Sequence, residues 1–324
     1  MKYLQRPFDF DRDFLSVRDF LSASYARYGH SVNWRIERWE YAFYFVTPFL
    51  ANWRQPNPSR QAADAALAFL TDHLGLWETP EGDLAGLVTI EHADLTHPGY
   101  GEFFIQRHPD HLTLLPEMMA YAEQNLRNPA TQRLFIHADP EDTDLIPLLE
   151  AKGFQPDPSA VNIESEFNLE SQPLPETTAL PKGFHLQSMA ENNDLPRRCK
   201  AFGCAFNHPD PLEWPAVLSY EDLQHAPDYR KEHDIVVVAP GGEMAAFCLI
   251  WHDQPNQIAI LEPVGAQPAF RRMGLAREAV FEAMRRVRNA GTRKVIVGSG
   301  QKFYQLLGFA PVENRIKYEK PSAK

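Results

Sequence analysis

The stretch QPAFRRMGLAREAV, residues 267–280, joins an apolar run to an amphipathic helix and decides the fold of the C-terminal half. The run before it, IAILEPVG at residues 258–265, predicts a strand. After it, apolar residues recur every three or four positions, which predicts a helix within residues 270–291 that lays one face on a sheet. We therefore expect the helix to begin near the carboxyl end of a strand, where α/β proteins bind ligands.

The residues that enter this helix are typical of an anion-binding turn. A helix N-terminus presents unpaired amides and a partial positive charge. Gly274 has no side chain and Ala276 has a small one, so a ligand can approach the backbone closely. Arg271 and Arg272 add full positive charge beside those amides. The turn predicts a phosphate cradle suited to a diphosphate, although it matches neither the P-loop nor the GxGxxG pattern.

The combination of motifs resembles the GNAT N-acetyltransferases. Arg271-x-x-Gly274-x-Ala276 is similar to the acyl-CoA motif of that family, which has Gln or Arg, then Gly, then Gly or Ala at this spacing. FYQLLGF, residues 303–309, resembles a later signature in which a Tyr precedes Gly-Phe by four residues, and Tyr304 holds that place. The resemblance covers residues 184–324, with the motif, helix, strand and Tyr in the family's order.

The resemblance implies binding of acetyl-CoA and direct transfer of its acetyl group to an amine. It implies that pantetheine pairs with the backbone of Val264, Gly265 and Ala266, and that the diphosphate is held by the amides of Arg272, Met273, Gly274, Leu275 and Ala276. Tyr304 is the predicted proton donor to the departing thiolate, because a phenol with a pKa near 10 is neutral at neutral pH. Glu262 is the predicted base, acting directly or through water. His252 and His208 are weaker candidates for the base.

A proline-rich stretch divides the chain. NLESQPLPETTALPKG, residues 168–183, predicts an extended linker between domains at 1–167 and 184–324. The first half repeats the order of strands and helices of the second, including LLEAKGF against FYQLLGF. We expect an α/β (α+β) protein with two tandem GNAT-like domains, each a mixed, mostly antiparallel central sheet flanked by helices. This arrangement resembles tandem GNAT proteins such as the mycothiol synthase group.

The first half departs from the family pattern where phosphate would bind. The residues opposite Arg271, Gly274 and Ala276 are Leu112, Leu115 and Glu117, and the residue opposite Tyr304 is Leu149. Leucines and a carboxylate cannot cradle phosphate, so we expect a degenerate copy. Its aromatic segment contains Trp34, Trp39 and Phe43, which we expect in the core, because large apolar side chains usually bury.

Composition excludes several classes of protein. The 324 residues carry a net charge of -11, which argues against a nucleic-acid partner and weakly favours a cationic or amine substrate. The three cysteines, Cys199, Cys204 and Cys248, form no CxxC motif. No cluster of His, Asp or Glu has the spacing of metal ligands. We expect no metal, no membrane span, a cytoplasmic location, and a monomer or homodimer.

The expected function is an acetyl-CoA-dependent N-acetyltransferase acting on a small-molecule primary amine. Two alternatives stay open: a non-catalytic protein that binds or senses acyl-CoA, and an acetyltransferase of a protein or peptide amine. If the first half docked a protein substrate, its aromatic segment 34–45 would be exposed. The sequence does not identify the acceptor amine, because one fold hosts many substrates.

Overall fold

The computed structural model describes residues 2–97 and 99–321, and the chain divides into two compact units. Unit 1 comprises Met1–Thr47, Ala63–Ile163 and Glu313–Lys324. Unit 2 comprises Pro48–Ala62 and Glu164–Val312. Among the described residues, no helix combines the length and the apolar character that crossing a membrane requires.

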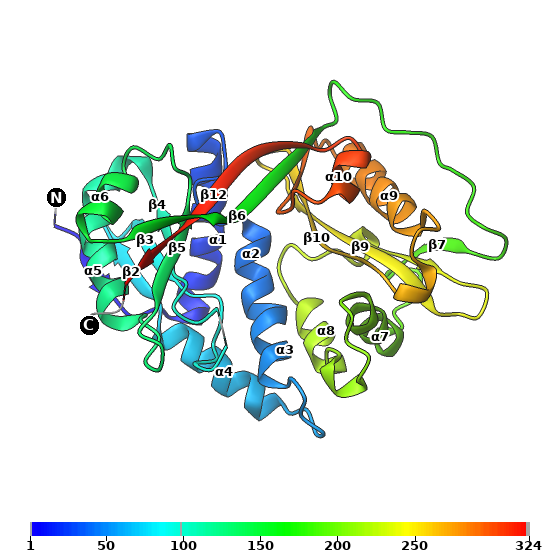
Figure 1. Cartoon of the computed structure of the whole chain (residues 1–324), viewed down its shortest axis with the longest axis horizontal. Helices are drawn as coiled ribbons and strands as arrows, with labels where there is room; N and C mark the ends of the chain where they lie inside the picture. The colour runs from blue at the N-terminus through cyan, green and yellow to red at the C-terminus, as the bar shows by residue number, and fades with distance from the viewer. Residues whose placement is uncertain (1, 98, 322–324) are drawn as a thin grey trace. The chain divides into compact units, whose positions relative to one another are not determined.

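Unit 1 contains an antiparallel four-stranded sheet in the order β1 (Leu4–Arg6), β2 (Gly75–Glu78), β3 (Leu84–Thr89) and β4 (Phe104–Arg107). A second strand pair joins β5 (Leu134–Ala138) to the end of β12 (Ala310–Lys320), antiparallel and side by side in Figure 1. The helices are α1 (Phe10–Tyr28), α2 (Ile36–Tyr41), the π-helix η1 (Ala42–Val46), most of α4 (Arg60–Asp72), the 3-10 helix η2 (Pro109–Leu114), α5 (Leu115–Asn125) and α6 (Ile146–Ala151).

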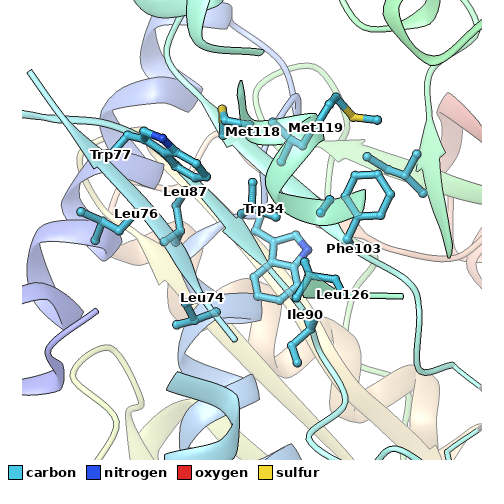
Figure 2. Close-up of a cluster of buried hydrophobic side chains, with 14 of the residues drawn as sticks. Trp34, Leu74, Leu76, Trp77, Leu87, Ile90, Phe103, Met118, Met119 and Leu126 are labelled. Atoms are coloured by element: carbon cyan, nitrogen blue, oxygen red, sulfur yellow. The ribbon is translucent and has the colours of Figure 1, made fainter. Parts of the chain in front are cut away.

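The core of unit 1 holds the aromatic segment. Trp34, Trp39 and Phe43 are 8%, 0% and 3% exposed, as predicted, and no residue from 34 to 45 is exposed. Figure 2 shows Trp34 and Trp77 together with Met118 and Met119 of α5 among the buried side chains. The exposed aromatic surface that a protein-docking role would need is therefore absent from this segment.

Unit 2 is built on the strand order β7 (His185–Ser188), β8 (Asp234–Val238), β9 (Met244–Asp253), β10 (Ile258–Ala266) and β11 (Lys294–Val297), followed by the end of β6 (Gln155–Asn168). Only the β10–β11 pair is parallel among these neighbours. One face is covered by α9 (Leu275–Asn289) and α10 (Lys302–Leu306), and the other by α7 (Leu195–Ala205) and α8 (Val217–Leu223) (Figure 1). Short 3-10 helices are η3 (Pro211–Glu213), η4 (Lys231–His233) and η5 (Pro268–Phe270).

The segment 48–62, which includes most of α3 (Thr47–Ala51), groups with unit 2. Arg54 donates its backbone N–H to the Leu212 carbonyl at 2.9 Å and forms an ion pair with Glu213. Phe49 packs its ring against Phe202 of α7 with centroids 5.8 Å apart. The sequence-based ranges 1–167 and 184–324 did not anticipate this segment, because its partners lie about 160 residues further along the chain.

Most of the last strand belongs to unit 1, although it follows unit 2 in the sequence. The pattern NRIKYEK, residues 314–320, predicts a strand, and β12 confirms it, but its residues from Glu313 onward group with unit 1. Ile316–Lys320 pair with β5, while the end of β6, residues 165–168, pairs with β11 in unit 2. Each unit therefore contains strand residues from the far side of the predicted linker.

The linker residues 168–183 form no strand or helix of their own, but they are held along α9. Thr178 donates its N–H to the Glu278 carboxylate at 3.1 Å, and Arg285 donates to the Pro175 carbonyl at 3.1 Å. Leu174 and Leu180 pack on the core of unit 2. The segment has turns at residues 169–171 and 182–183, and it is attached to the helix whose N-terminus forms the candidate site.

Candidate active site

The carboxyl-terminal half of β10 leaves one of its neighbouring strands. β10 pairs in parallel with β11 only as far as Ile260, whereas it pairs with β9 as far as Ala266. A bulge interrupts the β9 pairing between Leu261 and Val264. In the described part of the chain, no strand pairs with the β11-facing edge beyond Ile260. Val264, Gly265 and Ala266 therefore lie on an open strand edge, where an extended ligand can form main-chain hydrogen bonds.

The turn between η5 and α9 presents a run of unpartnered backbone amides. Among the residues that the structure describes, none accepts a hydrogen bond from the N–H groups of Arg272 to Arg277. The first bond of the helix runs from Glu278 N to Gly274 O at 3.2 Å. Arg272 and Gly274 have φ angles of 64° and 79°. Left-handed residues alternating with others turn successive N–H groups toward one side, which makes an anion-binding concavity.

This conformation also corrects the expected start of the helix. The helix begins at Leu275, not at Phe270, because the positive φ values of Arg272 and Gly274 are incompatible with a right-handed helix. Gly274 has open space above it: a Cβ there would have only the Arg277 guanidinium within 4 Å, at 3.9 Å. Met273 is exposed and Leu275 is buried, so both would contribute their amides to the turn and not their side chains. These features support the predicted phosphate cradle, whose ligand stays a prediction.

Arg271 holds the turn in place. Its guanidinium donates to the Ala266 carbonyl at 3.1 Å, the Ala205 carbonyl at 2.8 Å and the Asn207 Oδ1 at 2.9 Å. The side chain thus ties the end of α7 to the turn that follows β10, and its charge remains beside the free amides. Arg272 is exposed and forms no ion pair with any residue that the structure describes, so its charge is available to a ligand.

Tyr304 lies beside the β10 bulge. It is 8% exposed, belongs to the apolar core of unit 2 and contacts the Phe309 ring at a centroid distance of 5.8 Å. Burial raises the pKa of its phenol, and the neighbouring Cys248 and Glu262 raise it further. Cys248 stands opposite Val264 in the β9–β10 pairing. The fold therefore brings Tyr304, Glu262 and Val264 to one place, with the phenol protonated at neutral pH.

Glu262 is half-buried at the bulge, and its carbonyl accepts a hydrogen bond from the Trp251 indole at 2.8 Å. The weaker candidates lie in other surroundings. Burial lowers the pKa of His252, whose neighbouring charges are aspartates and an arginine and not the groups at the bulge. His208 stands 3.4 Å from the Glu213 carboxylate and contacts the Trp53 ring. Among these three candidates, only Glu262 is a neighbour of Tyr304.

The corresponding turn of unit 1 has different residues in different surroundings. η2 follows β4 at Pro109 as η5 follows β10 at Pro268, so the two turns correspond. Leu115 is 4% exposed and Leu112 packs on the core, while Glu117 accepts a hydrogen bond from the Trp77 indole at 2.9 Å. Leu149, opposite Tyr304, is fully buried on α6. Leu112, Leu115 and Glu117 supply neither the bare backbone nor the positive charge of the turn in unit 2, in line with the prediction of a degenerate copy.

Comparison with known proteins identifies the second unit. Residues 199–309 match the model of the acetyltransferase (GNAT) family, and this range contains the cradle, the bulge and Tyr304. Unit 2 contains a GNAT acetyltransferase domain. The domain transfers an acyl group from an acyl-CoA cosubstrate to an amine, so the protein is an N-acyltransferase. No curated protein matches the chain significantly.

Solved structures extend the likeness of fold to nearly the whole chain. A tandem GNAT protein from the clavulanic acid biosynthesis pathway has a TM-score of 0.62 at 13% identity, covering 99% of this chain and 100% of its own. A GCN5-related N-acetyltransferase from Sphaerobacter thermophilus has a TM-score of 0.58 at 15% identity, covering 99% and 97%. An N-myristoyltransferase from Saccharomyces cerevisiae has a TM-score of 0.55 at 14% identity, covering 99% and 80%. The predicted tandem arrangement of GNAT-like folds is therefore confirmed.

The sequence did not reveal the residues that hold the candidate site in place. The acceptors of the Arg271 guanidinium, Ala205 and Asn207, precede it by 66 and 64 residues and carry no motif. Gly265 has a packing role that the sequence did not reveal, since a Cβ there would lie 2.6 Å from the Phe247 ring and 2.8 Å from the Ala205 side chain.

Proposed function

We propose that this protein is an acetyl-CoA-dependent N-acetyltransferase whose acceptor is a small-molecule primary amine. The observation that carries the proposal is the run of free N–H groups from Arg272 to Arg277 at the end of the splayed strand β10. Unpartnered amides at the start of a helix attract a diphosphate, and coenzyme A carries one. The net charge of -11 and the burial of the aromatic segment 34–45 support a small cationic acceptor over a docked protein.

The residues of the site have separable roles in binding. The amides of Arg272 to Ala276, with the Arg272 side chain, would hold the diphosphate. The open edge of β10 at Val264, Gly265 and Ala266 would pair with the pantetheine and so orient the thioester, which lowers the entropic part of the barrier. Arg271 positions this edge by its bond to the Ala266 carbonyl, which leaves the neighbouring amides of the edge for the ligand.

Two neighbouring side chains would accept and donate the protons of the reaction. An acyl-CoA supplies an activated thioester carbonyl. Glu262 takes a proton from the ammonium group of the acceptor, directly or through water, and the neutral amine then attacks the thioester carbonyl. This half-buried carboxylate lies at the bulge of β10, beside the open strand edge. Tyr304 keeps its proton at neutral pH, because its pKa is raised, and donates it to the departing sulfur.

A thiol-release assay tests the enzyme. Acetyl-CoA is mixed with a panel of amines, namely polyamines, amino acids, aminoglycosides and short peptides, and free coenzyme A is measured. We expect turnover with at least one small amine, and its loss in Gly274→Glu, because the new carboxylate would occupy the space above the free amides. Undiminished affinity of Gly274→Glu for coenzyme A would refute the cradle.

The same assay separates the enzyme from a sensor of acyl-CoA. Tyr304→Phe removes the proton donor and leaves the cradle intact, so the enzyme should lose turnover and keep its affinity for coenzyme A. Tight binding of acetyl-CoA without turnover across the whole panel favours the sensor. Turnover with peptides alone favours a protein or peptide acceptor, and turnover with longer acyl-CoA thioesters alone excludes acetyl as the transferred group.

A further inference from the structure

Unit 1 contains a cavity of about 280 Å³ that the acyl-transfer site does not use. It opens where β4 and β5 separate. Within the described residues, the two strands are joined in parallel where β4 begins: Phe103 N donates to Phe135 O at 3.0 Å, and Phe135 N donates to Gly101 O at 2.8 Å. Beyond this point the residues of β4 and β5 line the cavity, together with residues 28–34, the loop 139–145, Glu313 and Arg315.

The floor of the cavity carries a buried cation with an unsatisfied donor. Arg107 is 5% exposed, and its Nη2 is paired with the Asp142 carboxylate. Its Nη1 has no hydrogen-bond partner among the residues that the structure describes. The backbone of Arg107 is fixed by Asn33, whose side chain accepts from its N–H at 2.8 Å and donates to its carbonyl at 2.7 Å. A buried guanidinium N–H without a well-placed acceptor costs about 1–3 kcal/mol, and a ligand oxygen would remove that cost.

A second donor stands beside Arg107. The Tyr28 hydroxyl is buried and has no well-formed hydrogen bond within the described part of the chain. Burial raises the pKa of this phenol, whereas the charge of Arg107 and a weak side-chain hydrogen bond from Arg107 to the phenol oxygen act against that increase. The phenol therefore stays protonated at neutral pH. Together the two groups offer N–H and O–H donors to one anionic group, and a carboxylate has two oxygens to accept them.

The loop above these donors is acidic. DPEDTDL, residues 139–145, lines the cavity and contributes Asp139, Glu141, Asp142 and Asp144. Asp142 is paired with Arg107, whereas the other three acids form no ion pair with any residue that the structure describes. Such a rim attracts a cation and repels a polyanion. The acidic rim and the apolar residues Leu112 and Leu115 of the turn argue against coenzyme A as the occupant.

The walls add an apolar component. Trp34 and Phe104 contact each other with ring centroids 4.8 Å apart, and Ile105, Ile136 and Ala138 complete the lining. The volume lies just below the range of about 300–1,000 Å³ that is typical of pockets for drug-sized ligands. The cavity therefore suits a ligand of few atoms with a short apolar part.

We propose that the cavity of unit 1 binds a free α-amino acid with an apolar side chain. Arg107 and Asp142 lie side by side in the wall, as the carboxylate and the ammonium of an α-amino acid lie side by side on one carbon. The carboxylate accepts from Arg107 Nη1 and Tyr28, the ammonium faces the acidic loop, and the side chain lies on Trp34 and Phe104. This site is independent of the acyl-transfer site of unit 2.

Calorimetric titration of the whole protein, without any acyl-CoA, tests the proposal. The probes are leucine, 3-methylbutylamine, which lacks the carboxylate, and 4-methylpentanoate, which lacks the ammonium. We expect saturable binding of leucine and affinities at least roughly tenfold weaker for both analogues, because each loses one charge-assisted interaction. No saturable heat with leucine, or equal affinity for leucine and the amine, would overturn the proposal.

Substitutions locate the binding in unit 1. Tyr28→Phe and Arg107→Lys should each weaken leucine binding by roughly tenfold, because each removes one donor to the carboxylate. Asp144→Asn should weaken leucine binding and leave 4-methylpentanoate unaffected. Asp144 and the control Asp83 are both exposed, so Asp83→Asn should change nothing, and folding is not at risk in this pair. Gly274→Glu in unit 2 should bind leucine normally. Loss of leucine binding in Gly274→Glu, together with normal binding in Tyr28→Phe and Asp144→Asn, would place the amino acid elsewhere and refute the site.

Discussion

Gly274 combines a left-handed backbone with open space above it. Its φ is 79°, and an added Cβ would meet no atom closer than the Arg277 guanidinium at 3.9 Å. Gly274→Ala therefore costs about 1 kcal/mol of folding free energy through the backbone conformation alone. The methyl group would also stand over the free amides, so we expect affinity for coenzyme A to fall by roughly tenfold or more, measured by calorimetric titration.

Gly291 provides the matched control. It lies in the turn after α9 with a φ of 96° and has no atom within 4 Å of an added Cβ. Gly291→Ala should lower the midpoint of thermal unfolding about as much as Gly274→Ala, because the strain is the same. Its affinity for coenzyme A should match that of the parent protein. Equal affinities of the two variants would show that the Gly274 amides do not contact the ligand.

The raised pKa of Tyr304 predicts how the rate of the transfer step depends on pH. Burial raises the pKa of its phenol above the ordinary value near 10, so the proton is retained to higher pH than on an exposed tyrosine. Ionisation of Tyr304 should therefore cause no decrease in kcat between pH 7 and about 10. Tyr304→Phe should lower kcat by roughly tenfold to ten-thousandfold at all these pH values. Tyr318→Phe, at a buried phenol in unit 1, is the control. An alkaline decrease centred below pH 9 that disappears in Tyr304→Phe would contradict the raised pKa.

The residues of the candidate site were accessible to sequence reasoning only where local chemistry marks them. Gly274 and Ala276 follow a strand and open a helix, and that is enough to indicate exposed amides. The direction of the Arg271 side chain was not accessible, because its acceptors, Ala205 and Asn207, belong to a helix end that only the tertiary fold brings near. The Arg107 cavity was missed for the same reason, since its lining comes from four separate stretches of unit 1.

Between elements, Glu278 connects α9 to the linker. It is 2% exposed, accepts from the Thr178 N–H at 3.1 Å and is paired with Arg277 at 2.9 Å. Glu278→Ala removes both interactions of the carboxylate and leaves the Thr178 N–H without its acceptor. We therefore expect a loss of about 1–3 kcal/mol of folding free energy. Lys182 in the linker is exposed, and trypsin should cleave after it faster in this variant.

Glu282 provides the comparison on the same helix. Its ion pairs with Arg285 and Arg286 are partly exposed, and such pairs contribute little to stability. Glu282→Ala should leave cleavage after Lys182 unchanged. If the Glu278 and Glu282 variants were cleaved at the same rate, the linker would not depend on α9 for its protection.

The sequence pattern predicted the helices and strands more readily than it predicted which elements pack against one another. The period of α9 predicted its apolar face, and Leu275, Ala279, Val280 and Met284 are buried as expected. The stretch NRIKYEK, residues 314–320, predicted a strand, but such a pattern does not say which neighbouring strands it will pair with. Which strands it pairs with depends on the tertiary fold, which places residues 316–320 beside β5 in unit 1.

At the scale of the whole molecule, the chain's last strand makes unit 1 depend on residues that follow unit 2 in the sequence. Ile316–Lys320 pair with β5, Tyr318 is 3% exposed in the core of unit 1, and Ile316 packs beside it. Truncation after Val312 would remove the neighbour of β5 and open this core. A buried aromatic side chain contributes about 1.5–3 kcal/mol by burial alone, and the strand pairing is lost in addition.

We therefore expect truncation after Val312 to destabilise unit 1 selectively, and hydrogen exchange resolved by residue can measure this. Amides of β5, Leu134–Ala138, should lose protection, because their antiparallel partners are gone. Amides shared by β9 and β10 should keep theirs, since both strands and the helices that cover them lie in unit 2. Asn314→Ala, at an exposed position of β12, should leave both sets unchanged. Full protection of β5 after truncation would mean that unit 1 folds without its last strand, and equal losses in β5 and β10 would mean that the two units unfold together.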